Sequence, residues 1–484
     1  MTTAQDPIQP QPAAIRVSML IGGEWVAGDA TYDVFDPYRG SLVATAPCSD
    51  HDDLDRALSA AVKAKAAAAR MPATERAKLL RRVAERLLAR KPDIGETMSR
   101  ETGKAIKDSL AELDRSIDTL NLSAEEAVRI EGEHVPLDAS PMGFGKIALL
   151  LRFPVGVVAA ITPFNAPLNL ACHKIGPALA AGNVVVLKAP PQCPGVIHKL
   201  IECFVDAGTP PGFLNVLYGA DIGPALVRDQ RAEFITFTGS TRAGAEIRAA
   251  AGLRRVALEL GGIGPTIVHD DAAIAEAAPL CARNAMRLAG QSCISVQNVY
   301  VHENIFHSFM EKLAATVATM KLGDPLDPAT DIGTVIDQAA AERIDRSVQA
   351  ALAAGATAIT GGHRQGAVYE PTILTDVVPD MPVVCEEIFG PVMTVRPYAD
   401  IDPVIAEISE RRLGLQGGIF TKSLELALKV ARTMRVGGII INGTSTFRTD
   451  QLPYGGVKDS GIGREGPRYA IREMTEERLI VFNL

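Results

Sequence analysis

The pattern of apolar and polar residues divides the chain into a helical N-terminal part and two longer stretches where strands and helices alternate. Between residues 53 and 130, apolar positions recur at helical spacing, as in LLRRVAERLLAR, and predict several amphipathic helices. From residue 136 to 151, glycine and proline followed by a short apolar run predict a β-hairpin.

The region from residue 155 to 260 alternates β-branched runs with helical segments. The expected strands are 155–162, 183–188, 213–218, 233–238 and 255–260, and the expected helices are 168–181, 195–207 and one from about 241. These strands are apolar on both faces, which is typical of a parallel sheet covered by helices. The pattern therefore predicts an α/β fold built from βαβ units.

The alternation starts again after Gly262 and predicts a second α/β domain. Its expected helices are 272–290 and 306–320, and its expected strands are 296–301, 357–360, 392–397, 418–420 and 438–442. No fixed-period repeat or low-complexity tract interrupts this order.

Composition and charge narrow the functional class. The chain has 484 residues, 47% hydrophobic and 22% charged, a globular composition with room for two or three domains. The net charge of −8 offers no electrostatic footprint for nucleic acid or an anionic membrane. No apolar run approaches the roughly 20 residues of a membrane span. Residues 1–16 lack a basic signal-peptide start, and their Pro and Gln content predicts a loosely held tail. We expect a cytoplasmic protein.

The seven cysteines are odd in number and form no CxxC pair, which argues against a disulfide framework or a structural zinc site. No histidine cluster has metal-ligand spacing, so we expect no metal. Most of these cysteines are expected to be buried and inert, and sequence context must indicate whether one is a nucleophile.

Three residues are candidates for catalysis. Cys293, in GQSCIS, follows a Gly-containing turn after a predicted helix, and the alternative is a buried structural thiol. Glu259, in LELGG, ends an apolar strand as a general base would, and the alternative is a salt-bridged surface residue. Asn165, in TPFNAP, offers an amide donor for an oxyanion, and the alternative is a turn residue.

Two segments suit a phosphate-containing ligand. FTGSTRAG (237–244) combines a strand, a turn at Gly239 and Ser240, and a helix N-terminus, where backbone N–H groups favour a pyrophosphate. It is not the GxGxxG fingerprint. Lys188 ends another strand and is placed to bind ribose hydroxyls, with a solvated lysine as the alternative.

Together these motifs resemble the aldehyde dehydrogenase superfamily over residues 17–484. The matching motifs are TPFNAP, VVVLKAP, FTGSTRAG, LELGG, GQSCIS, EEIFGP and PYGGVKDSGIGREG, in the order and spacing of that family. Each motif alone is weak evidence, but seven of them in the same order and spacing identify the family specifically.

The resemblance implies a role for each matching residue. Cys293 is the implied nucleophile, Glu259 the general base and Asn165 the oxyanion donor. The implied cofactor contacts are Thr162, Pro163, Lys188, Gly239, Ser240, Glu387 and Phe389, and the cofactor is NAD or NADP. No metal is implied.

The resemblance also implies three structural parts. An open, Rossmann-like parallel-sheet domain for NAD(P) is expected at 1–128 and 149–261. An α/β catalytic domain is expected at 262–466. A small β extension at 129–148 and 467–484 is expected to join subunits into a homodimer or homotetramer.

The implied reaction forms a thiohemiacetal and then a thioester on Cys293, which a Glu259-activated water hydrolyses to the carboxylate. Glu259 favours this hydrolytic class over a CoA-acylating enzyme. A catalytically silent scaffold or crystallin-like protein, or an esterase using the same thiol, is a further alternative.

Departures from the family pattern bear on cofactor and substrate. Pro191 stands where strict NAD users often carry a Glu that repels a 2′-phosphate, so NADP is expected to be tolerated or preferred, although no arginine follows closely. Arg115 and Arg448 lie where related lactaldehyde, non-phosphorylating glyceraldehyde-3-phosphate and phosphonoacetaldehyde dehydrogenases often hold an anionic group. For Arg115 the favoured alternative is a helical arginine that is simply placed among acidic residues. Ser292 precedes the nucleophile where some phosphate users carry Arg. The expected substrate is a small hydroxy- or anionic aldehyde.

Overall fold

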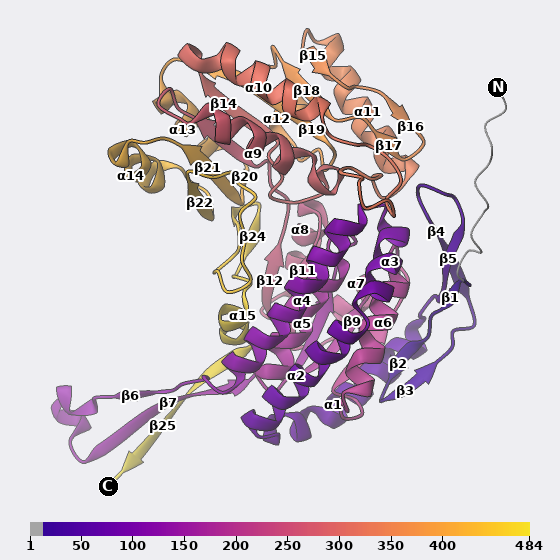
Figure 1. The fold of residues 1–484 in the computed structure, drawn as a ribbon. Helices are drawn as coiled ribbons and strands as arrows, with labels where there is room; N and C mark the ends of the chain where they lie inside the picture. Colours follow the sequence, from indigo (N-terminus) through magenta and orange to yellow (C-terminus); the bar gives the residue numbers. More distant parts are fainter. Residues whose placement is uncertain (1–12) are drawn as a thin grey trace.

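The computed structural model describes residues 13–484, so most of the expected N-terminal tail lies outside the described residues. Two α/β bodies lie one above the other, and a thin β arm projects from the lower one (Figure 1). The α/β fold class expected from the alternating pattern is confirmed.

The lower body is built on an eight-stranded sheet of order β24-β12-β11-β8-β9-β10-β2-β3. Its parallel centre comprises β8 (Val157–Ile161), β9 (Val184–Lys188), β10 (Leu214–Leu217), β11 (Phe234–Thr238) and β12 (Arg255–Glu259). The antiparallel edges are β2 (Met19–Ile21), β3 (Glu24–Val26) and β24 (Gly461–Ile462). The five expected strands are therefore confirmed, whereas the edge strands had too few residues to show a pattern.

Helices cover this sheet. They are α1 (His51–Arg70), α2 (Ala73–Ala89), α3 (Lys91–Thr102), α4 (Ile106–Ala127), α5 (Pro167–Ala180), α6 (Pro194–Asp206), α7 (Ile222–Arg228) and α8 (Thr241–Ala251). Helices α2, α4 and α5 pack side by side on one face (Figure 1). Helix α5 is buried along its whole length, including its polar residues Asn169, His173 and Lys174. A separate sheet, β1 (Ile15–Arg16), β5 (Leu42–Pro47) and β4 (Thr31–Phe35), flanks this body.

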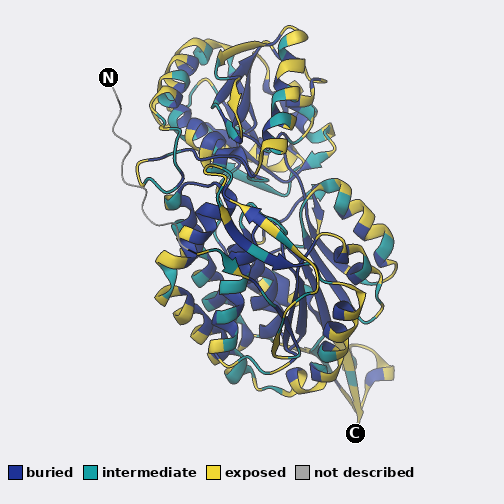
Figure 2. Cartoon of the chain, turned by 90° about the vertical axis from the view of Figure 1, so that its right-hand side faces the viewer, coloured by how far each residue is buried: buried dark blue, intermediate teal, exposed yellow. Residues whose placement is uncertain are grey.

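The upper body holds a seven-stranded sheet of order β15-β18-β19-β14-β13-β21-β22. Its strands are β13 (Pro265–Val268), β14 (Asn298–His302), β15 (Thr357–Thr360), β18 (Thr372–Thr375), β19 (Val392–Tyr398), β21 (Gln416–Phe420) and β22 (Gly438–Ile441). Its helices are α9 (Ile274–Met286), α10 (Phe306–Ala318), α11 (Gln338–Ala353), α12 (Pro382–Cys385), α13 (Ile401–Glu410) and α14 (Leu424–Thr433). Each body encloses its own core of buried apolar side chains (Figure 2).

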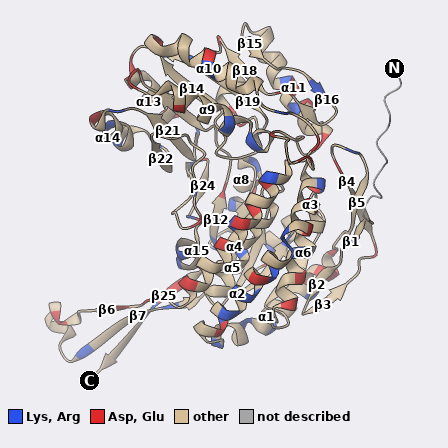
Figure 3. Ribbon diagram, viewed as in Figure 1, with Lys and Arg blue, Asp and Glu red and all other residues tan. Residues whose placement is uncertain are grey.

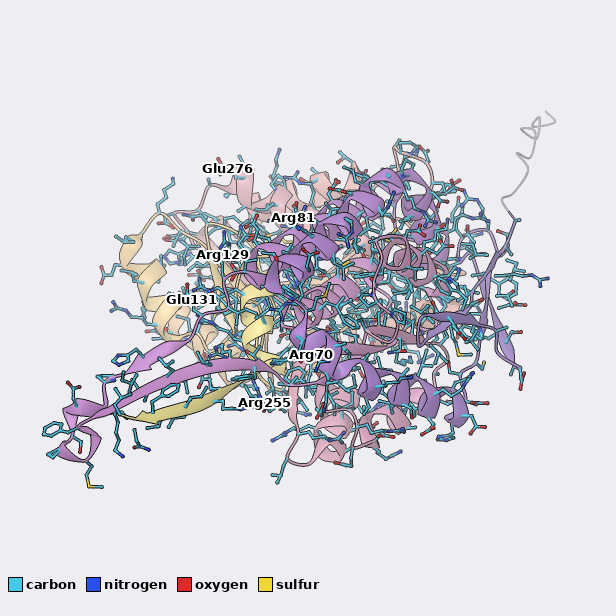
Figure 4. All side chains as sticks on the ribbon, turned by 90° about the horizontal axis from the view of Figure 1, so that it is seen from below. Arg70, Arg81, Arg129, Glu131, Arg255 and Glu276 are labelled. Carbon is cyan, nitrogen blue, oxygen red and sulfur yellow. The ribbon has the colours of Figure 1, made fainter. Side chains whose placement is uncertain are left out.

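The arm is a three-stranded antiparallel sheet of β6 (Glu133–Val135), β7 (Lys146–Pro154) and β25 (Thr475–Asn483). Seen from below, it extends away from the body with side chains on both faces (Figure 4). The hairpin and the C-terminal strand match the sequence pattern. The arm differs from the expected ranges 129–148 and 467–484, because β7 continues to Pro154 and residues 467–473 form helix α15, which packs on α5.

Positions of basic and acidic residues are mixed along the outer helices (Figure 3). No helix among the described residues combines the length and apolar character that crossing a membrane requires.

The helix expected at 272–290 ends at Met286, and this expectation was too long. Leu288 (φ 57°), Ala289 (φ 50°) and Gly290 (φ 70°) follow in the left-handed region, which non-glycine residues enter only at a cost of about 1–3 kcal/mol. The sequence predicted a Gly-containing turn before Cys293, but apolar periodicity continues through Leu288 and Ala289, so it did not reveal that the turn already begins there. The three residues reverse the chain and lead directly to Cys293.

We predict that Gly290→Ala lowers both stability and turnover. A β-carbon at Gly290 would overlap the carbonyl group of Gly390, so the loop leading to Cys293 must shift. The free energy of unfolding, measured in urea, should fall by more than about 2 kcal/mol, since strain and overlap add. Gly208→Ala is the control, because Gly208 (φ +83°) has open space where a β-carbon would lie and carries backbone strain alone. Equal losses in the two variants would contradict this account.

Candidate active site

A cavity of about 420 Å³ brings together most of the predicted site residues. Its lining includes Cys293, Glu259, Asn165, Pro163, Gly239, Ser240, Glu387, Phe389, Arg115 and Arg448. These residues come from the first sheet, from α4, and from loops of the upper body and the C-terminal segment. Thr162 and Lys188 lie outside this lining, at the ends of β8 and β9.

Cys293 is half-buried, and its Sγ lies 3.0 Å from the Tyr454 Oη. Burial raises the pKa of the thiol to about 12, while the Tyr454 hydrogen bond and the nearby Arg448 charge act to lower it. The residue borders an open cavity rather than filling a core, which favours a nucleophile over a structural thiol.

Asn165 is held beside the Cys293 loop. Its Nδ2 donates to the Gln291 carbonyl at 3.1 Å. Its own carbonyl accepts from Lys104 Nζ at 2.9 Å, and Lys104 forms a buried ion pair with Glu112 at 2.5 Å. Glu112 in turn accepts from the Leu168 N–H at the start of α5 at 2.9 Å. A buried charge pair and a helix N-terminus therefore fix the backbone of Asn165. No pattern in the sequence indicates this pairing.

Glu259 is buried at the end of β12, and its Oε2 has no hydrogen-bond partner. Burial and the nearby Glu465 raise its pKa well above the ordinary value, against Arg448 and Lys174, which lower it. The alternative of a salt-bridged surface glutamate is therefore wrong. A buried carboxyl with a raised pKa beside a nucleophile is typical of a proton-exchanging group.

A buried ion triad lies behind Glu259. Glu465 Oε1 is 3.1 Å from Lys174 Nζ, and Glu465 Oε2 is 2.9 Å from Arg448 Nη2. Although burial opposes its ionisation, the two cations together hold the pKa of Glu465 below its ordinary value. Lys174 lies on α5, so the triad joins that helix to the C-terminal segment. Sequence reasoning did not assign Lys174 or Glu465, because nothing in their spacing pairs residues 291 positions apart.

The two candidate anion-binding arginines already have acidic partners. Arg115 Nη2 lies 2.6 Å from Asp450 Oδ1, and Asp450 is also 2.9 Å from His173 Nε2. Arg448 is nearly fully buried, and its Nε has no hydrogen-bond partner. Arg448 therefore lies in the cavity wall with its Nε buried, whereas Arg115 is more exposed and lies toward the outer rim.

A second cavity, of about 260 Å³, suits the adenosine part of a dinucleotide. Lys188 is buried in its wall, and burial lowers the pKa of the ammonium to about 8. The Oγ1 of Thr162, directly after β8, is buried without a partner. Both groups need a polar partner, which ribose hydroxyls would supply. Arg228 also lines this cavity, although no arginine stands close to Lys188 in the sequence.

The remaining cofactor candidates, Ser240, Glu387 and Phe389, line the first cavity. Ser240 caps α8, accepting from the Ala243 N–H at 3.3 Å, and leaves the helix N-terminus open. Glu387 accepts from the Gly262 N–H at 3.1 Å, and burial raises the pKa of Glu387 to about 7. Phe389 lies edge-to-face with Phe164 at 5.9 Å. These residues fit a pyrophosphate, a ribose and a nicotinamide in that order. Within residues 13–484, no group of three acidic, His or Cys residues is placed to hold a metal ion.

We predict that Glu465→Gln destabilises the fold by roughly 3 kcal/mol in urea unfolding, because it leaves two buried cations without their anion. Glu75→Gln is the matched control, since Glu75 pairs with Lys78 at 2.9 Å on the surface, where such pairs contribute about 0.5 kcal/mol. If both variants unfold at the same urea concentration, the triad is not a stabilising element.

Comparisons with known proteins identify the family to which the chain belongs. A model of the aldehyde dehydrogenase family matches residues 25–480. The chain is 46% identical over 471 residues to a 3-sulfolactaldehyde dehydrogenase of Priestia aryabhattai, covering 97% of this chain and 98% of that protein.

Two solved structures are similar throughout. One is aldehyde dehydrogenase 21 of Physcomitrella patens with the reaction product succinate, with a TM-score of 0.95, 38% identity, and coverage of 98% and 99% of the two chains. The other is the NADP-dependent glyceraldehyde-3-phosphate dehydrogenase of Bacillus halodurans with NADP, with a TM-score of 0.95, 36% identity, and coverage of 97% and 100%. The resemblance drawn from the seven motifs is confirmed, and the chain belongs to the aldehyde dehydrogenase family.

Proposed function

We propose that this enzyme oxidises a small anionic aldehyde to the carboxylate with NAD or NADP, through a covalent intermediate on Cys293. The observation that carries the proposal is the cavity itself. Four of the residues that line it are Cys293, Glu259, Asn165 and Arg448. The nucleophile, the base, the oxyanion donor and an anion-binding group are thus within reach of one small molecule.

The thiolate of Cys293 adds to the aldehyde carbon and forms a thiohemiacetal. Its oxyanion develops beside the Asn165 amide, which exchanges its hydrogen bond with the Gln291 carbonyl for one to the substrate oxygen. A bound nicotinamide supplies the hydride acceptor for the oxidation. Asn165 needs no large movement, because its backbone is already fixed by Lys104.

Glu259 is proposed to take a proton from the water that attacks the thioester carbon. The C–S bond then breaks, the carboxylate leaves, and the thiolate of Cys293 is restored. The raised pKa of Glu259 makes its carboxylate a stronger base than an exposed glutamate. This hydrolytic step distinguishes the proposal from the CoA-acylating alternative.

The anionic end of the substrate is proposed to bind at the two arginines that line the cavity, Arg448 in its wall and Arg115 toward the rim. A planar guanidinium suits a carboxylate or sulfonate. The relative named 3-sulfolactaldehyde dehydrogenase and the structure holding succinate both support an anionic substrate. We favour a three-carbon hydroxyaldehyde carrying a sulfonate.

The arm is proposed to pair with a second copy of the chain. It exposes large apolar side chains that the single chain leaves uncovered, namely Met142, Phe144, Ile147, Leu479, Val481, Phe482 and Leu484. Exposed apolar clusters of this kind mark protein interfaces. A homodimer or homotetramer would cover them.

Cys293→Ala should lower the rate of NAD(P)H formation at 340 nm by roughly 10⁴-fold or more, because the covalent route is lost. Cys281→Ala, at a buried thiol in α9, is the control and should retain activity. The assay is run with and without CoA. Turnover that depends on CoA would identify the acylating alternative, and turnover by Cys293→Ala would refute the covalent mechanism.

We predict that a negatively charged group on the aldehyde determines which substrate the enzyme prefers. We expect kcat/KM for 3-sulfolactaldehyde to exceed that for lactaldehyde, which lacks the sulfonate, by about 10²-fold, the effect of one charge-assisted contact. Arg448→Lys should remove most of this difference by raising the KM for the sulfonate, because an ammonium lacks the planar guanidinium that matches the anion. Arg435→Lys, on the surface, is the matched control. Equal kcat/KM for the two aldehydes in the unmodified enzyme would contradict the proposal.

Pro191 should permit use of NADP. Pro191→Glu is expected to reduce kcat/KM for NADP by about tenfold or more while leaving that for NAD nearly unchanged, because an acid there repels the 2′-phosphate. Pro191→Gln tests the same position without a charge and should have little effect on the ratio. A similar loss with both variants would show that shape, rather than charge, sets the preference.

A further inference from the structure

Tyr454 places a phenol directly against the reactive sulfur. Its ring is buried in a small apolar cluster with Ile294 and Leu415, and its Oη lies 3.0 Å from Cys293 Sγ. The Cys293 sulfur is the hydrogen-bond partner of the Tyr454 hydroxyl. A buried hydroxyl needs a hydrogen-bond partner, and the sulfur supplies it.

The backbone holds Tyr454 in this position. Its N–H donates to the Glu465 carbonyl at 3.1 Å, and its carbonyl accepts from the Glu465 N–H at 2.6 Å. Because the Glu465 side chain is anchored by Lys174 and Arg448, the phenol is tied to the buried ion triad. The distance between hydroxyl and sulfur is thus set by rigid structure.

Arg448 lies over the aromatic face of Tyr454. The guanidinium carbon is 3.8 Å from the ring centroid, within the range of a strong cation–π contact. The Glu465 carboxylate fixes the guanidinium on its other side at 2.9 Å. A cation above the ring withdraws electron density from the phenol, so its O–H becomes a stronger hydrogen-bond donor.

We propose that Tyr454 is a further catalytic residue, whose hydroxyl donates a hydrogen bond to the Cys293 sulfur and stabilises the thiolate, with Arg448 strengthening that donor through the ring. The inference rests on the proposed function, in which Cys293 is the nucleophile. Burial alone disfavours the thiolate, and a hydrogen bond to the charged sulfur offsets part of that cost.

The phenol keeps its proton throughout. Burial and the neighbouring sulfur raise the pKa of Tyr454 well above its ordinary value, so it acts as a donor and not as a base. The thiol proton leaves to a base in the solvent or cavity. The role of Tyr454 therefore precedes substrate addition, whereas the Asn165 amide acts on the oxygen that forms afterwards.

The test is the pH dependence of Cys293 alkylation by iodoacetamide in the full-length enzyme without cofactor. In this reaction the thiolate sulfur bonds to the reagent carbon and iodide leaves, so its rate follows the thiolate fraction. Peptide mass spectrometry assigns the rate to Cys293, with Cys293→Ala as the blank for Cys48 and Cys385. Tyr454→Phe should move the midpoint upward by about one pH unit and slow alkylation at pH 8 by about tenfold, as expected for a hydrogen bond to a charged group.

Tyr218→Phe is the matched control, since its hydroxyl is equally buried but has no hydrogen-bond partner. It should leave the alkylation profile unchanged. Thermal unfolding confirms that Tyr454→Phe is folded, because the change removes only the hydroxyl. Arg448→Lys keeps the charge but loses the flat stack, and should move the midpoint in the same direction by a smaller amount.

An alkylation profile of Tyr454→Phe that coincides with that of the unmodified enzyme overturns the inference, even if turnover falls. Failure of the proposed function appears separately, as turnover retained in Cys293→Ala. The two results are distinguishable because alkylation requires neither substrate nor cofactor.

Discussion

The pairing of one buried carboxylate with two buried cations organises the active site. Glu465 holds Lys174 of α5 and Arg448 of the C-terminal segment at once. Each of these charges would be costly to bury alone, and together they satisfy one another. The triad fixes the Arg448 guanidinium above Tyr454, places Tyr454 against the nucleophile, and supplies the charges that surround Glu259.

A second buried ion pair, Lys104 with Glu112, holds Asn165 in place. Lys104 and Glu112 join the segment before α4, α4 itself and the start of α5, and so they hold the oxyanion donor from behind. The nucleophile is positioned differently, by three left-handed residues after α9. Electrostatic anchors thus set one side of the cavity and backbone strain sets the other. Both devices keep catalytic groups in place before substrate arrives, which reduces the reorganisation that the reaction requires.

The sequence predicted the central strands well, because parallel strands buried on both faces form continuous apolar runs such as 183–188. It also placed Cys293, Glu259 and Asn165 in one site, through motifs that are weak individually and specific in register, and the structure brings these three residues to one cavity. Short edge strands such as Met19–Ile21 could not be recognised, since three residues cannot display a period. The kink at Leu288 and Ala289 was equally hidden, because neither residue type favours positive φ.

The contacts that hold the site together could not be predicted from the sequence, because they join residues far apart in the chain. Glu465 and Lys174 are 291 residues apart, and the partner of Arg448 could not be chosen from the many acids in the chain. Only the fold brings these residues together. Sequence motifs therefore indicated which residues share the cavity, and the structure was needed to show what holds them there.

Burial of Cys293 favours its protonated thiol, and this also bears on how readily the sulfur is oxidised. Peroxides attack thiolates much faster than thiols, and oxidation beyond sulfenic acid is irreversible for most proteins. A sulfur whose burial raises its pKa to about 12 spends little time in the vulnerable form. We therefore expect the desolvation that makes this thiol harder to ionise to slow its oxidation as well.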